Sequence, residues 1–165
     1  MTLAVTDEPP DRPEWVAETV RLLATGVDRW RRDLLARVAA ASDAELAAGA
    51  DDAWGLGQVA THLLLVERGV IGIALRLARA EAPGRTGQPR PSAAAVSRVR
   101  IAELAAKTAE AVDRLRRDFP AEPDVVAVAR HPFYGDLNVF GWLLTLPNHY
   151  AAHLEALERG MPSPL

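Results

Sequence analysis

The chain has 165 residues, of which 49% are hydrophobic and 25% charged, values typical of one soluble globular domain with a sizeable core. Its net charge is −3, whereas a module that binds a nucleic-acid duplex normally carries a basic excess, so we expect no nucleic-acid partner. The absence of cysteine excludes disulfides, a thiolate nucleophile and every metal site built on cysteine.

Two further features bear on location. The segment Met1 to Pro10 is polar and proline-rich and lacks the basic and apolar regions of a signal peptide. The richest apolar stretch is interrupted by Glu67, Arg68 and Arg76, so no run of 18 apolar residues is available to span a membrane. We therefore expect a cytoplasmic protein without a membrane partner.

The abundance of alanine and leucine favours an all-α fold. Residues 1–12 are expected to form a flexible tail, and residues 13–165 a single domain. The first helix is predicted from Pro13 to Ala40. Its arginines fall mainly off the apolar stripe and are expected to face water: Arg21, Arg29, Arg31, Arg32 and Arg37. Its apolar side chains recur in steps of three and four: Trp15, Thr19, Leu22, Leu23, Gly26, Trp30, Leu34 and Val38. Ser42 and Glu45 have the spacing of a capping box, which predicts a short helix ending near Gly49.

The second long helix is predicted from Leu56 to Ala82. Its inward stripe is Val59, His62, Leu63, Val66, Val70, Ile73, Ala74 and Leu77. Glu67 and Arg68 follow His62 by about one turn and are expected on a solvated face or an interface. Residues 83–91 are rich in proline and glycine, which predicts a break in the helix.

The third helix is predicted from Ser92, as its N-cap, to Phe119, which precedes Pro120. Its stripe is Ile101, Leu104, Thr108, Val112, Leu115 and Phe119. Residues 121–135 form a long connection with an extended apolar run. The fourth helix is expected to start near Asp136, as its cap, and to stop before Gly160. Pro147 lies inside this helix and predicts a kink, because proline lacks an N–H and clashes with the preceding turn.

Four amphipathic helices of this length predict a four-helix bundle. The stripe of the fourth helix is Val139, Trp142, Leu143, Leu146, His149, Tyr150, His153, Leu154 and Leu157. The connections 41–55 and 121–135 are long enough to cross the bundle, so a simple up-and-down order is not required. Off the main stripe, Leu64, Ile71 and Leu75 suggest a surface for a homodimer.

Three of the four histidines fall on inward stripes. His149 and His153 are four residues apart, so their rings lie one above the other on one helix face and can bind one metal ion. His62 on the second helix can supply a third nitrogen. The alternative is that these are ordinary buried histidines, hydrogen-bonded to the backbone or to polar neighbours. The third histidine favours a metal site, because burying three unpaired imidazoles is costly and an ion relieves that cost.

Three segments carry a resemblance to a known family. They are Trp54-x-x-x-Gln58-Val59-x-x-His62-Leu63, the segment His131-Pro132-Phe133-Tyr134-Gly135-Asp136-Leu137, and His149-Tyr150-x-x-His153-Leu154. Together they resemble the DinB-like bundle family, over about Trp15 to Arg159. The resemblance implies a four-helix bundle with a nonstandard helix order and long crossover connections. It also implies a divalent metal held by His62, His149 and His153, whereas Pro147 departs from the family pattern.

Other residues could shape such a site. His131 could be a pocket-lining proton donor or an outer-shell group, although a loop histidine bonded to the backbone is the more frequent case. Trp54 and Trp142 could wall a substrate cleft, although aromatic residues more often simply fill a core. Gln58 or Thr61 could orient a ligand ring.

Relatives in the DinB-like family include metal-dependent transferases that activate a low-molecular-weight thiol and proteins classed as hydrolases. The resemblance thus implies a small-molecule substrate and activation of a thiol, or of water, for S-transfer or hydrolysis. Zinc fits three nitrogen ligands best, and nickel, iron or manganese also accept them. One alternative is a non-catalytic bundle that binds a metal or small ligand, for example in a stress response. Another is a bare interaction bundle in which the histidines never meet.

Overall fold

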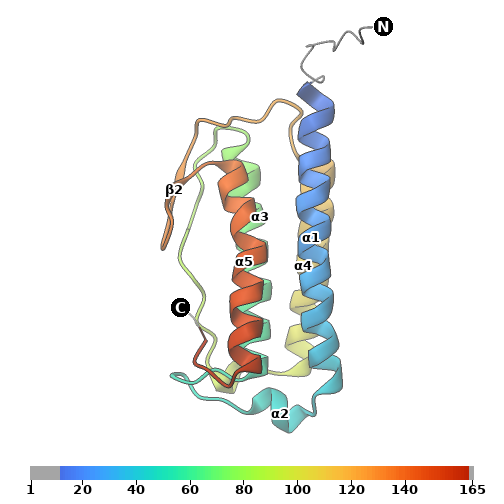
Figure 1. The fold of residues 1–165 in the computed structure, drawn as a ribbon, viewed down its shortest axis with the longest axis vertical. Helices are drawn as coiled ribbons and strands as arrows, with labels where there is room; N and C mark the ends of the chain where they lie inside the picture. The colour runs from blue at the N-terminus through green and yellow to red at the C-terminus, as the bar shows by residue number, and fades with distance from the viewer. Residues whose placement is uncertain (1–11, 164–165) are drawn as a thin grey trace, which may run out of the picture.

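The computed structural model describes residues 12–163, and in them the chain forms the predicted four-helix bundle (Figure 1). The four long helices are α1 (Arg12–Ala40), α3 (Leu56–Leu77), α4 (Arg98–Asp118) and α5 (Val139–Glu158). Shorter elements are α2 (Asp43–Ala47), the 3₁₀ turn η1 (Ala93–Ala95), and the strands β1 (Ala129–His131) and β2 (Gly135–Leu137). Of the tail predicted over residues 1–12, all but Arg12 lies outside the described residues.

The helix order is nonstandard. α3 packs against α4 and α5, and α1 packs against the same two helices. The colours of Figure 1 show that α1 and α5 run in one direction and α3 and α4 in the other. Parallel neighbours cannot be joined by a tight turn, so the chain between α3 and α4 runs back along the length of the bundle. The crossover is therefore this connection, and not either of the connections 41–55 and 121–135, which are also long enough for one.

The buried face of α1 differs from the predicted one. Trp15 is 48% exposed and Leu22 is 57% exposed, although both were assigned to the inward stripe. The buried side chains are Val16, Val20, Ala24, Val27, Arg31, Leu34 and Val38. These residues also recur in steps of three and four, and only Leu34 and Val38 are shared with the predicted stripe. The prediction chose the wrong face because it gave weight to the large side chains of Trp15 and Leu22. Valine and alanine side chains fill the closely packed interface instead.

The helix termini follow their capping side chains. The capping box of Ser42 and Glu45 is formed as predicted. α4 begins at Arg98, later than expected, because the hydroxyl of Ser97 accepts the N–H of Arg100. The N-cap of α5 is Asn138, whose Oδ1 accepts the N–H of Gly141 at 3.0 Å, and not Asp136.

A small hairpin, which the sequence did not predict, precedes α5. Its strands β1 and β2 are antiparallel, with Ala129 opposite Leu137 and His131 opposite Gly135. Gly135, at the end of the turn, has φ of +78°, a left-handed conformation that glycine adopts without steric strain. Trp142 anchors the hairpin to α5, because its indole N–H donates to the carbonyl of Ala129 at 3.2 Å.

α3 is the most buried of the long helices. By length and composition it could cross a membrane, but 72% of its most apolar window is buried, as in the core helix of a soluble bundle. Leu64, Ile71 and Leu75 are 0%, 2% and 7% exposed within one chain. These three residues therefore fill the core and offer no surface for a homodimer. α5 continues through Pro147 as a single helix.

Candidate metal centre

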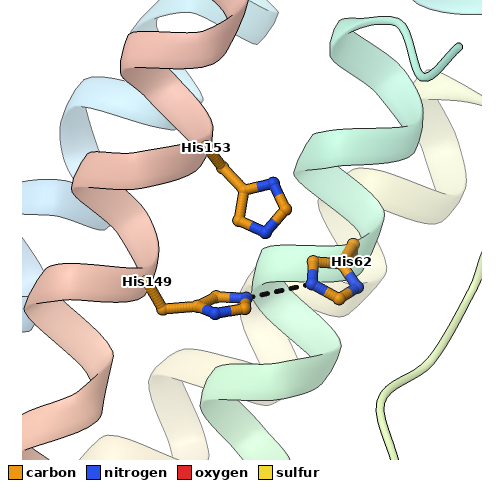
Figure 2. Close-up of side chains that lie close together, drawn as sticks. All are labelled: His62, His149 and His153. Carbon is orange, nitrogen blue, oxygen red and sulfur yellow. Dashed lines mark hydrogen bonds between the residues drawn. The ribbon is translucent and has the colours of Figure 1, made fainter. Parts of the chain in front are cut away.

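His62 on α3 and His149 and His153 on α5 point toward one another (Figure 2). One nitrogen from each ring lies within 4.8 Å of the others. The Nε2 atoms of His62 and His149 are 2.9 Å apart. The one-turn spacing of His149 and His153 places both rings on the face of α5 that meets α3.

Outer contacts orient two of the three rings. The Nδ1 atom of His62 lies 2.7 Å from the carbonyl oxygen of Pro89, in the crossover between α3 and α4. A carbonyl only accepts, so Nδ1 of His62 carries the proton and Nε2 turns its lone pair toward the cluster. The Nδ1 atom of His153 lies 3.1 Å from the hydroxyl of Ser163. Such contacts orient and stabilise imidazole ligands at metal sites.

The three imidazoles are held in the neutral form that binds metal ions. Burial, reinforced by the neighbouring histidines, lowers the pKa of His149 to about 3. Burial and His62 lower the pKa of His153 to about 4. Burial also lowers the pKa of His62, against the opposing effect of its bond to Pro89. At neutral pH each ring therefore offers a lone pair without first releasing a proton.

The arrangement fits a divalent cation. The Nε2 atom of His153 is buried and has no hydrogen-bond partner in the part of the chain that the structure describes. An unpartnered buried polar atom is costly, and a cation at the centre of the cluster would satisfy it. Within residues 12–163 no further histidine, aspartate or glutamate joins this group. Three protein ligands leave a coordination position for an exogenous molecule, as in catalytic rather than structural sites.

Trp54 forms one wall of the cluster. Its ring stacks on His153 with centroids 6.3 Å apart and lies 5.0 Å from the ring of His62. A cavity of about 530 Å³ is lined by Trp54 and Ser163, each of which also contacts a histidine of the cluster. Its lining residues are Asp51, Asp52, Trp54, Arg90, Pro91, Ser92, Pro162 and Ser163. None of the three histidines lines this cavity, so it can hold a small molecule near Trp54 but does not open directly onto the cluster.

Gln58 and Thr61 do not orient a histidine. The side chain of Gln58 bonds the backbone of Ala50, Gly55 and Pro91, and so ties loops to the start of α3. The hydroxyl of Thr61 donates to the carbonyl of Gly57 on its own helix. The possibility that either residue orients a ligand ring finds no support, because backbone groups nearby satisfy both side chains.

His131 and Trp142 are not members of the three-histidine cluster, although His131 is close enough to contribute to the lowered pKa of His149. The Nδ1 atom of His131 accepts the N–H groups of Phe133 and Tyr134, at 3.2 and 3.4 Å, within the hairpin turn. This is the loop histidine bonded to backbone that is the more frequent case. Trp142 is 2% exposed and packs 4.8 Å from the ring of His131, so it fills the core between α5 and the hairpin.

A buried polar network beside the cluster was missed. Glu67 is fully buried, where its carboxylate accepts from Arg31 of α1 and, at 2.6 Å, from the hydroxyl of Tyr150. Of the two positions expected for Glu67, a solvated face or an interface, the solvated face is wrong, and so is the water-facing position predicted for Arg31. The spacing contained a signal, because Glu67 follows Leu63 by four residues and Arg31 follows Val27 by four.

Comparison with known proteins agrees with this architecture. The family model of the DinB superfamily matches residues 26–157. The chain belongs to the DinB superfamily. This DinB-superfamily chain is also similar to the crystal structure of TT2238, a four-helix bundle protein, with a TM-score of 0.64 and 27% sequence identity. The similarity covers 85% of this chain and 98% of TT2238. No curated protein matches the sequence.

Proposed function

We propose that this protein is a metal-dependent enzyme that activates a low-molecular-weight thiol, or water, for S-transfer or hydrolysis. The observation that carries the proposal is the convergence of His62, His149 and His153 as neutral imidazoles. One of their nitrogens, Nε2 of His153, is buried and has no partner in the described residues. Zinc is the first choice of metal for three nitrogen ligands, and nickel, iron or manganese would also be accepted. The substrate is a small molecule.

The ion would supply Lewis acidity, which lowers the pKa of a thiol or water bound to it. The protein positions the ligands: Pro89 fixes the ring of His62, and Ser163 that of His153. Trp54 packs against the rings of His62 and His153 and restricts their movement. Because the chain has no cysteine, any thiol must arrive as a substrate.

Within residues 12–163 no carboxylate joins the three-histidine group as a base, which favours the thiol reaction over hydrolysis. Glu67 is the buried carboxylate of the described residues, but it is already engaged by Tyr150 and Arg31. A free thiol has a pKa of about 8.5, against about 15.7 for water, so it needs less help to ionise. The absence of a fourth protein ligand in the described residues argues against a closed site that only stores metal.

The test has two stages. Purified protein is first loaded with zinc, desalted and analysed for metal, alongside His149→Ala. We expect one ion per chain in the wild type and a substoichiometric amount in the variant. Loaded and chelator-treated proteins are then incubated with glutathione, mycothiol or bacillithiol and the electrophile 1-chloro-2,4-dinitrobenzene. Conjugate formation by the loaded protein alone supports a transferase, whereas equal formation by the chelator-treated protein contradicts it.

A further inference from the structure

A series of hydrogen-bonded side chains, exposed at Arg116 and buried at Glu67 and Tyr150, links all four long helices. Arg116 of α4 bonds Asp28 of α1, and Asp28 also bonds Arg31 on the same helix. Arg31 bonds Glu67 of α3, and Glu67 accepts the hydroxyl of Tyr150 on α5 at 2.6 Å. The charges alternate in sign along this series, so that each carboxylate is flanked by donors.

The last member of this hydrogen-bonded series is adjacent in sequence to a candidate metal ligand. Tyr150 directly follows His149, and its side chain is fully buried. Burial and the neighbouring Glu67 raise the pKa of Tyr150 well above its ordinary value, so the hydroxyl keeps its proton and donates. α5 is therefore tied to α3 at two adjacent positions, through His149 to His62 and through Tyr150 to Glu67.

His149 needs this tie more than its two companions do. The rings of His62 and His153 each have a hydrogen-bond partner for Nδ1, in Pro89 and Ser163. Nδ1 of His149 has no hydrogen-bond partner among residues 12–163, and because it is not one of the buried atoms that lack a partner, only solvent can satisfy it. Pro147 lies two residues earlier and lacks the N–H that would bond the preceding turn of α5. The backbone that carries His149 thus has a weakened constraint on its upstream side and a strong one at Tyr150.

We propose that Tyr150, held by Glu67 and Arg31, is a positioning residue that sets the height and rotation of α5 and thereby places His149 at the metal centre. The inference rests on the proposed function, since it concerns the same site. It assigns to the buried network a role in metal affinity that is separate from its role in stability. Outer groups that orient a ligand typically change metal affinity by 10- to 100-fold when they are lost.

The test compares two variants that remove the same atom. Tyr150→Phe deletes the hydroxyl bonded to Glu67, and Tyr134→Phe deletes the hydroxyl of a residue that is 59% exposed in the hairpin turn. Zinc affinity is measured by competition with a chromophoric chelator, at a temperature where circular dichroism shows both variants folded. We expect Tyr150→Phe to bind zinc at least tenfold more weakly and Tyr134→Phe to bind it as the wild type does.

A double variant separates positioning from general loosening of the bundle. If Tyr150 acts through His149, then Tyr150→Phe does not weaken the residual zinc affinity of His149→Ala further. The absorption spectrum of the cobalt-loaded protein gives a second readout, since we expect its ligand-field bands to shift in Tyr150→Phe and not in Tyr134→Phe.

Two outcomes would overturn the inference in distinguishable ways. The positioning role is overturned if Tyr150→Phe binds zinc as tightly as the wild type. It is also overturned if Tyr150→Phe weakens zinc binding equally in the wild-type and His149→Ala backgrounds. Either result leaves the proposed function standing. A wild-type protein that takes up neither zinc nor cobalt overturns the proposed function together with the inference.

Discussion

The Nε2 atoms of His62 and His149 lie 2.9 Å apart, although the two residues are 87 positions apart in the chain. The carbonyl of Pro89 takes the Nδ1 proton of His62, so the Nε2 atom of His62 can only accept. This contact therefore needs either a proton on Nε2 of His149 or a cation that both lone pairs share. The unpartnered Nε2 of His153 beside them is satisfied only in the second case.

Metal stoichiometry distinguishes the cluster from the remaining histidine. We expect His62→Ala to lose most of its zinc, because two imidazoles bind more weakly than three, and His131→Ala to retain a full equivalent. His131 is a suitable control, since it is also buried and its ring is occupied by the backbone of the hairpin turn. Elemental analysis after dialysis measures both. Equal metal loss in the two variants would contradict the assigned ligand set.

Acid destabilises the metal-free protein in a defined pH range. The pKa values of His149 and His153 are lowered to about 3 and about 4 by burial and their neighbours, whereas the unfolded chain takes up protons near pH 6.5. Stability is thus fully present above pH 6.5 and falls as the pH decreases toward the folded-state pKa values.

Urea unfolding in the presence of a chelator measures this loss. Between pH 7 and pH 5 we expect the free energy of unfolding to fall by on the order of 1–2 kcal/mol for each of the two histidines. The double variant His149→Gln/His153→Gln should show a much flatter dependence. Identical unfolding free energies at pH 7 and pH 5 in the wild type would show that the rings are not held neutral.

The ion pair of Arg31 and Glu67 supports the bundle. Arg31→Ala would leave the fully buried carboxylate of Glu67 without its cationic partner, and we expect a loss of about 3–5 kcal/mol in unfolding free energy. Arg32→Ala, one residue later on the exposed face of α1, should change it by less than about 0.5 kcal/mol. Chemical denaturation of the three proteins tests this, and similar midpoints for both variants would contradict the buried pairing.

Gly57 allows α2 to pack closely against the start of α3. A Cβ at this position would lie 2.2 Å from the carbonyl oxygen of Leu46 and 2.4 Å from Cγ1 of Val96. We expect Gly57→Ala to cost about 1–3 kcal/mol of stability, because backbone must move to admit the methyl group. Gly72→Ala, with no atom within 4 Å of the added Cβ, should gain about 0.5–1 kcal/mol. Thermal melts of both variants provide the measurement.

The sequence predicted the helices and the histidine pair because both follow from local geometry. The 3.6-residue period assigns an inward face to α3, α4 and α5, and it places His149 and His153 one turn apart on that face. The same rule, applied to α1, chose the wrong face, because Trp15 and Leu22 outweighed the smaller residues that are actually buried. Size and hydropathy alone therefore did not decide between two stripes with equal periodicity.

Only the tertiary structure decided which helices meet and at what height. The partnership of Arg31, Glu67 and Tyr150 depends on three helices packed together, and no local pattern reports that a charged residue on one helix faces its opposite on another. The crossover that brings Pro89 to His62 depends on the direction of α4, which loop length did not reveal. Periodicity thus determined which side of each helix turns inward, whereas packing against distant segments determined what each inward residue touches.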